Sequence, residues 1–254
     1  MTSGRRSLAF SGETWRAQLA LHNVWTDVRA AMQRMAASSD IRPADATGVF
    51  RPVDHPSGHP KFDVGPLVFS IPERASGRAA NLYIVAKGWI IFAPPREDDD
   101  RQTTLEFGTE VGYFRLSGDQ LTHVYGAHYD MDEQLTGHPV FHGQMSSQAE
   151  LANAIETEFH LPFDPENDQI AGLLRNVRTP TAQMDIFSVI TQISADHLVS
   201  EASGDEVKEA FSLLRKSCDF FVGAAGRLNY LNCEQAARCY RATHWYNREP
   251  IAST

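Results

Sequence analysis

The stretch of sequence that decides the fold is YFRLSGDQLTHVYGAHYD, residues 113–130. Aromatic and branched apolar side chains lie on both sides of Ser117-Gly118-Asp119, a combination typical of a tight turn. Two strands that are joined directly by such a turn run antiparallel. The stretch therefore predicts a β-hairpin whose second strand runs from Gln120 to about Asp130.

Short apolar segments extend this pattern, so that the whole region from Pro66 to about Gln144 has a β character. They include residues 67–71, 82–92 and 105–111, and Gly or Pro residues separate them. Consecutive strands without an intervening helix favour an antiparallel meander, and we expect roughly five to seven strands.

Helical patterns lie on both sides of this region. Apolar residues recur at helical spacing from residue 12 to about residue 36, which predicts one long helix. A connector rich in proline and glycine follows over residues 38–66, and we expect one short strand in it, around Val49.

The chain after residue 146 has a helical pattern to its end. Ser147 and Glu150 form a capping-box pattern that predicts the start of a helix, and further helices are predicted to begin near Thr181, Asp205 and Asn232. The fold class is therefore α+β. Residues 1–145 form an N-terminal helix plus an antiparallel sheet, and residues 146–254 form a helical region that either packs on the sheet as one compact domain or forms a subdomain.

The composition limits the partners and the compartment. The chain has 254 residues, with 32 acidic and 23 basic side chains and a formal net charge of -9. This charge disfavours broad binding to the nucleic-acid backbone, so nucleic acid is expected only as a substrate. The three cysteines are too few for a disulfide framework and indicate a cytoplasmic protein. Since the longest apolar run is short, no association with a membrane is expected.

Candidate functional residues concentrate between His123 and His142, which contains four of the ten histidines together with Asp130 and Asp132. Side chains alternate along a strand, so His128 and Asp130 should point to one face. His123 should point to the other face with the nearby tyrosines, which makes it a candidate core residue.

A metal site requires that the chain turn back on itself. In one straight strand His138 and His142 would be about 13 Å apart, too far for one ion. A hairpin through residues 131–137 would instead bring one of them beside His128 and Asp130. The candidate catalytic residues are thus His128, Asp130, His138 and His142. The candidate metal ligands are His128, Asp130 and His142.

Two histidines and one carboxylate with an open position suit a divalent metal ion and a bound water. The sequence does not specify which metal, and no nucleotide cofactor is expected because the chain has no P-loop. These residue types also have a structural interpretation, since histidines beside Pro or Gly often cap turns and an Asp after a strand accepts backbone N–H bonds. Both interpretations stay open.

The segment also carries a resemblance. Strands that end in His128-Tyr129-Asp130, followed by His138-Pro139 and then His142, resemble uncharacterised bacterial proteins of toxin–antitoxin and phage-defence systems. The resemblance implies an intracellular setting and either a protein partner or a homo-oligomer. It implies no established activity.

A second resemblance involves the last predicted helix. Arg238 and His244 resemble the arginine and histidine signature of HEPN ribonucleases, although Cys239 stands where that family usually has a polar residue. Three functions are open as hypotheses. The first is a metal-assisted hydrolase of a bacterial stress or defence system, in its narrower form a phosphodiesterase or nuclease. The others are a non-catalytic partner-binding or regulatory protein of such a system, and a HEPN-like ribonuclease that uses the C-terminal helix.

Overall fold

The predicted hairpin around Gly118 lies at the centre of a large sheet. Its strands are β5 (Gln102–Ser117) and β6 (Gln120–Met131), which pair antiparallel with Leu116 opposite Leu121. Gly118 has a φ of 63°, in the left-handed region that favours glycine. The hairpin prediction is confirmed.

The sheet continues on both sides of this hairpin. The structure is a computed structural model that describes residues 12–35, 40–43, 48–75, 78–94, 102–131, 139, 141–168 and 177–222. Its main strand order is β1-β3-β4-β5-β6-β7-β9, with neighbours antiparallel. The further strands of this path are β1 (Asp40–Pro43), β3 (Lys61–Ala75), β4 (Arg78–Phe92), β7 (Phe141–Met145) and β9 (Arg178–Pro180).

Three short strands pair beside this path. Strand β2 (Phe50–Val53) is antiparallel to β3, whereas β8 (Phe163–Asp168) and β10 (Phe221–Val222) run parallel to β6 and β5. The region after residue 146 is therefore not helical throughout. Strand β8 has no apolar alternation and β9 has only 3 residues, so hydrogen bonding to the existing sheet, rather than the local sequence, makes them strands.

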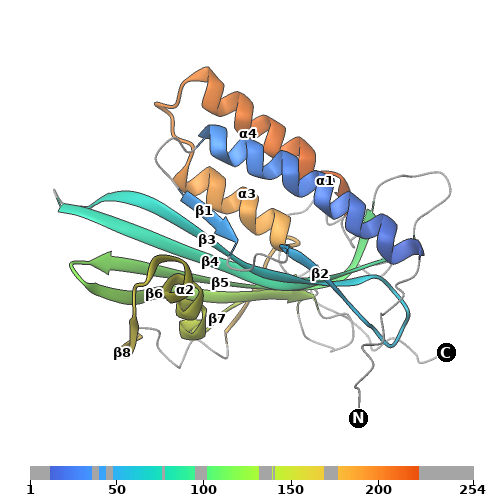
Figure 1. Ribbon diagram of the computed structural model, residues 1–254, viewed down its shortest axis with the longest axis horizontal. Coiled ribbons are helices and arrows are strands. Elements are labelled where there is room, and N and C mark those ends of the chain that lie inside the picture. Colours follow the sequence, from blue (N-terminus) through green and yellow to red (C-terminus); the bar gives the residue numbers. More distant parts are fainter. Residues whose placement is uncertain are drawn as a thin grey trace, which may run out of the picture.

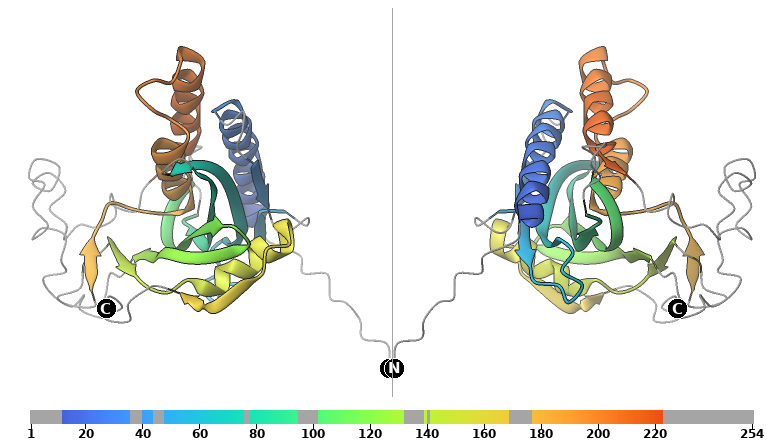
Figure 2. Two further views of the ribbon diagram at one scale, coloured as in Figure 1. Left: turned by 90° about the vertical axis from the view of Figure 1, so that its left-hand side faces the viewer. Right: turned by 90° about the vertical axis from the view of Figure 1, so that its right-hand side faces the viewer.

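Helices lie on both faces of the sheet. Figure 1 shows α1 (Gly12–Met35), α3 (Ile186–His197) and α4 (Asp205–Cys218) together on one face, and α2 (Ala152–Phe159) on the other. Figure 2 shows the same arrangement from two sides, with helices on both faces of the sheet. Of the helices in the described part of the chain, none has the length and apolar character needed to cross a membrane.

Two apolar cores hold these layers together. The larger core packs α1, α3 and α4 on the sheet, and Leu21, Val28 and Met32 of α1 are fully buried in it. Full burial of one such side chain stabilises the fold by about 1.5–3 kcal/mol. The smaller core packs α2 against Val85 and Phe114 on the opposite face. The predicted N-terminal helix and the α+β class are confirmed.

The helix after residue 146 begins differently from the prediction. The Ser147 hydroxyl donates to Asp168 on β8 at 2.5 Å instead of forming a capping box with Glu150. A 3-10 turn, η1 (Ala149–Leu151), precedes α2, and its N-cap residue Gln148 makes no side-chain cap. The predicted helix near Asn232, with Arg238, Cys239 and His244, lies outside the described residues.

Three tyrosines lie at the edge of the larger core, beside α3. Burial, the nearby Asp196 carboxylate and Tyr125 raise the pKa of Tyr113 to about 12. Burial and a 3.4 Å contact between the Tyr125 and Tyr129 hydroxyls raise the pKa of Tyr129 well above its usual value. Both phenols are therefore harder to ionise in the folded chain than in the unfolded chain.

An alkaline titration should detect these two phenols. Because their pKa values are raised on folding, their contribution to stability is complete below pH ~10 and is lost as the pH rises through the folded values. Phenolate absorbance in native protein should stay two tyrosines short of the unfolded protein near pH 11, and Tyr113→Phe should reduce that deficit to one. Identical native and unfolded titration curves would contradict this expectation.

Candidate metal centre

The strand register brings the predicted site residues together. Asp130 on β6 lies opposite His142 on β7, and His128 lies opposite Glu110 on β5. Between them, Tyr129 points into the larger core. Since side chains alternate along a strand, His128 and Asp130 point to the face that α1, α3 and α4 do not cover.

The three side chains converge on a single point. Nε2 of His142 is 2.9 Å from Oδ1 of Asp130, and Nε2 of His128 is 3.7 Å from Oδ2 of the same carboxylate. The two imidazole rings are almost perpendicular, with centroids 6.1 Å apart. One ligand atom from each residue can be chosen so that all three lie within 4.8 Å of one another.

These separations fit a divalent ion. Zinc binds histidine nitrogen and carboxylate oxygen at about 2.0–2.2 Å, so ligand atoms around one tetrahedral ion are roughly 3.3 Å apart. The contacts of 2.9 and 3.7 Å to Asp130 lie on either side of this value, and small side-chain rotations would equalise them. Two histidines and one carboxylate leave coordination positions open, as in catalytic rather than purely structural sites.

The three ligands differ in their access to solvent. The His142 side chain is buried, at 3% exposure, whereas the side chains of His128 and Asp130 are 30% and 40% exposed. His142 on β7 would thus bind an ion from its buried side, and solvent would reach the ion beside His128 and Asp130 on β6. The buried His142 side chain also fixes the orientation of the Asp130 carboxylate through their 2.9 Å contact.

His123 is a core residue, as predicted, but it lies on a different face from the expected one. Tyr113 pairs with Tyr125 and Phe114 with His123, so Val124 is an extra residue that forms a β-bulge. The bulge turns the His123 ring onto Phe114 in the smaller core, with centroids 4.7 Å apart. Alternation had predicted the tyrosine face, and the bulge makes this prediction wrong.

His123 is tied to a different acid. Its Nδ1 is 2.9 Å from Oδ1 of Asp168 on β8, and Asp168 also accepts the Ser147 hydroxyl. The His123 side chain is fully buried. It is therefore separated from the candidate metal centre, and its role is to attach β8 to the first half of β6.

The remaining residues to place are Asp132 and the histidines His138, His55 and His59. His138 and Asp132 lie outside the described residues, so the predicted role of His138 stays a prediction. His55 and His59 lie in a loop between β2 and β3, where Nδ1 of His55 contacts the Ser57 hydroxyl.

The structure adds an ion pair that the sequence analysis did not single out. Glu110 lies opposite His128, and its Oε2 is 2.9 Å from Nζ of Lys87 on β4. Lys87, Glu110 and His128 therefore form one row across three strands, on the face that carries the metal ligands. No spacing in the sequence connects these residues, because the register of three strands places them together.

Comparison of the chain with protein-family models, with curated proteins and with solved structures gave no match. The resemblance to toxin–antitoxin and phage-defence proteins therefore stays a prediction.

Proposed function

We propose that this protein is a metal-dependent hydrolase that acts on phosphate esters, with His128, Asp130 and His142 as the ligands of a divalent ion. The observation that supports the proposal is the convergence of their ligand atoms within 4.8 Å on two adjacent strands. Half-exposed His128 and Asp130 give a substrate access to that point. The proposal concerns a single site on the face of the sheet opposite α1, α3 and α4.

A divalent ion at this position would polarise the phosphoryl oxygen and make a water molecule more acidic. The protein must then supply a group that takes the proton of the attacking water. Glu110 is the nearest acid across the strand from His128, and antiparallel neighbours of this kind have Cβ atoms about 5 Å apart. We assign it as the proton acceptor, and its Oε2 lies 2.9 Å from Nζ of Lys87.

The reaction balances without any further reactant. Water adds to phosphorus, its proton passes to the Glu110 carboxylate, and the bond between phosphorus and the leaving oxygen breaks. The leaving oxygen takes a proton from solvent. Asp130 and the two histidines keep their positions throughout, because they are fixed by the pairing of β6 with β7.

Hydrolysis of bis(p-nitrophenyl) phosphate by protein loaded with Zn²⁺ or Mn²⁺ tests this proposal. We expect Glu110→Gln to keep its metal and its fold but to lose activity by about a hundredfold or more, the usual effect of removing a general base. Asp130→Ala should lose both metal and activity.

His55→Ala is the matched control, since His55 is a partly exposed loop histidine away from the site, and it should keep full activity. A metal-loaded protein that does not hydrolyse the diester would refute the hydrolase assignment. Full activity in Glu110→Gln would refute the assigned role of Glu110.

A further inference from the structure

A pocket of about 280 Å³ opens beside the row of Lys87, Glu110 and His128. It lies where β2, β3 and β4 meet, at a break in the pairing of β3 with β4 between Val64 and Leu67. Gly65 does not pair with β4 there, and its N–H donates instead to the Val49 carbonyl at 2.8 Å. The break in the pairing therefore creates the space.

The walls of this pocket combine bare backbone with two cations. Gly48, Gly65 and Gly88 line it, and a Cβ atom on Gly48 would have no neighbour within 4 Å, so a ligand can approach the main chain closely there. Arg51 from β2 and Lys87 from β4 are the two basic residues among the lining residues, and Asp63 is the one acidic residue. A planar guanidinium and a mobile ammonium together suit a compact oxyanion with a double negative charge.

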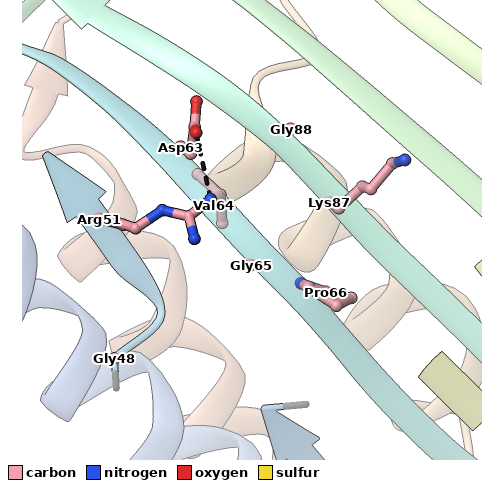
Figure 3. Close-up of a pocket in the computed structure, with 8 residues that line it drawn as sticks. All are labelled: Gly48, Arg51, Asp63, Val64, Gly65, Pro66, Lys87 and Gly88. Carbon is pink, nitrogen blue, oxygen red and sulfur yellow. Dashed lines mark hydrogen bonds and ion pairs between the residues drawn. The ribbon is translucent and has the colours of Figure 1, made fainter. Parts of the chain in front are cut away.

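Both cations have acidic partners in the structure. Figure 3 shows Arg51 beside Asp63, where the two side chains are 3.3 Å apart, and Lys87 pointing away from Gly65 and Pro66. The Lys87 ammonium contacts Glu110 instead. All four side chains are at least one third exposed, so these ion pairs are weak and can exchange partners with a bound anion.

The pocket and the metal ligands lie on the same face of the sheet. Lys87 pairs across β4 and β5 with Glu110, which pairs with His128 on β6. Two strand spacings separate Lys87 from His128, which is roughly 10 Å. One substrate molecule can therefore occupy both places.

We propose that this pocket binds a second phosphoryl group of the substrate, at the end of the row that runs from Lys87 through Glu110 to the metal ligand His128. The assignment to a substrate rests on the proposed hydrolase function, whereas the binding of phosphate does not. Lys87 turns from Glu110 to the phosphoryl group when this group binds.

Titration of inorganic phosphate into the full-length, chelator-treated protein tests the pocket without any metal. At constant ionic strength, we expect saturable changes in the NMR signals of the Gly48, Gly65 and Gly88 amides. Arg51→Ala and Lys87→Ala should each raise the Kd about tenfold or more, because each removes a charge-assisted hydrogen bond. Acetate should bind about tenfold more weakly than phosphate, because it has a single charge.

Lys61→Ala is the matched control, because Lys61 lies on β3 close to the pocket residues Asp63 and Gly65, but its Nζ rests 5.0 Å from the Trp89 ring centroid and it does not line the pocket. It should bind phosphate like the unmodified protein. Shifts that do not saturate would contradict the binding of phosphate in this pocket. An unchanged Kd in both Arg51→Ala and Lys87→Ala would contradict it as well. Equal affinity for acetate would overturn the phosphoryl assignment. Because the metal is absent, these results are separate from those of the hydrolysis assay.

Discussion

Replacing Asp130 with alanine is expected to lower the affinity for Zn²⁺ by about a hundredfold or more. The Asp130 carboxylate faces Nε2 of both His128 and His142, so its removal leaves two separated histidines. Even residues that only orient a metal ligand change the affinity by about 10–100-fold, and the loss of a ligand itself should be at least as large. Isothermal titration calorimetry with Zn²⁺ measures the effect.

Asp130→Asn separates the loss of a ligand from the loss of structure. Asparagine has the same shape as aspartate, and its amide oxygen can take the place of Oδ1 beside Nε2 of the buried His142, so this variant should fold like the unmodified protein. A neutral amide is a poorer ligand than a carboxylate, so its affinity for Zn²⁺ should also fall. His55→Ala should bind Zn²⁺ normally.

Two results would contradict the assignment of Asp130 as a metal ligand. Unmodified protein that binds no stoichiometric metal would refute the metal centre. Unchanged affinity in Asp130→Ala and Asp130→Asn would place any bound metal elsewhere. In either case the contact between Asp130 and His142 would be a structural pair at the sheet surface, and the partner-binding hypothesis would gain support.

Replacing Gly88 with alanine is expected to destabilise the fold by about 3 kcal/mol, near the upper end of the usual cost of overpacking. Gly88 lies on β4 opposite Thr109 of β5, in the middle of the sheet. A Cβ atom at residue 88 would overlap the Gly108 carbonyl oxygen and would lie 3.1 Å from Cα of Thr109. Both neighbours are backbone atoms of a central strand, so they cannot move aside without breaking the pairing.

Urea unfolding followed by circular dichroism measures this change. Gly12→Ala is the matched control, since a Cβ atom there has no neighbour within 4 Å, and its free energy of unfolding should change by no more than about 0.5 kcal/mol. If Gly88→Ala were as stable as this control, the close approach of β4 and β5 at Gly88 would be wrong.

Local patterns in the sequence predicted the fold class because they reflect local physical preferences. The apolar stripe of Leu21, Val28 and Met32 predicted α1, and the turn at Gly118 predicted the pairing of β5 with β6. Strands β8 and β9 were not predicted. Their few residues have no apolar alternation, and they depend on hydrogen bonds to β6 and β7.

The candidate site could be predicted in part. The two-residue spacing of His128 and Asp130 predicted that these two ligands lie on one face. The hairpin hypothesis named His142 as one of two histidines that could join them. Glu110 and Lys87 could not be found in this way, because they join the site through the register of β4 and β5. The position of His123 was wrong because alternation alone cannot reveal a bulge.

The bulge at Val124 divides β6 into two segments. The alternation of side chains between the two faces of the sheet shifts by one residue from the first segment to the second. His123 faces the smaller core in the first segment, and His128 and Asp130 face the metal centre in the second. A relative with one residue fewer between Leu121 and Gly126 could keep His123 or the His128–Asp130 pair in place, but not both. The length of this short stretch is therefore part of the signature by which proteins with the same site can be recognised, together with the identities of the three ligands.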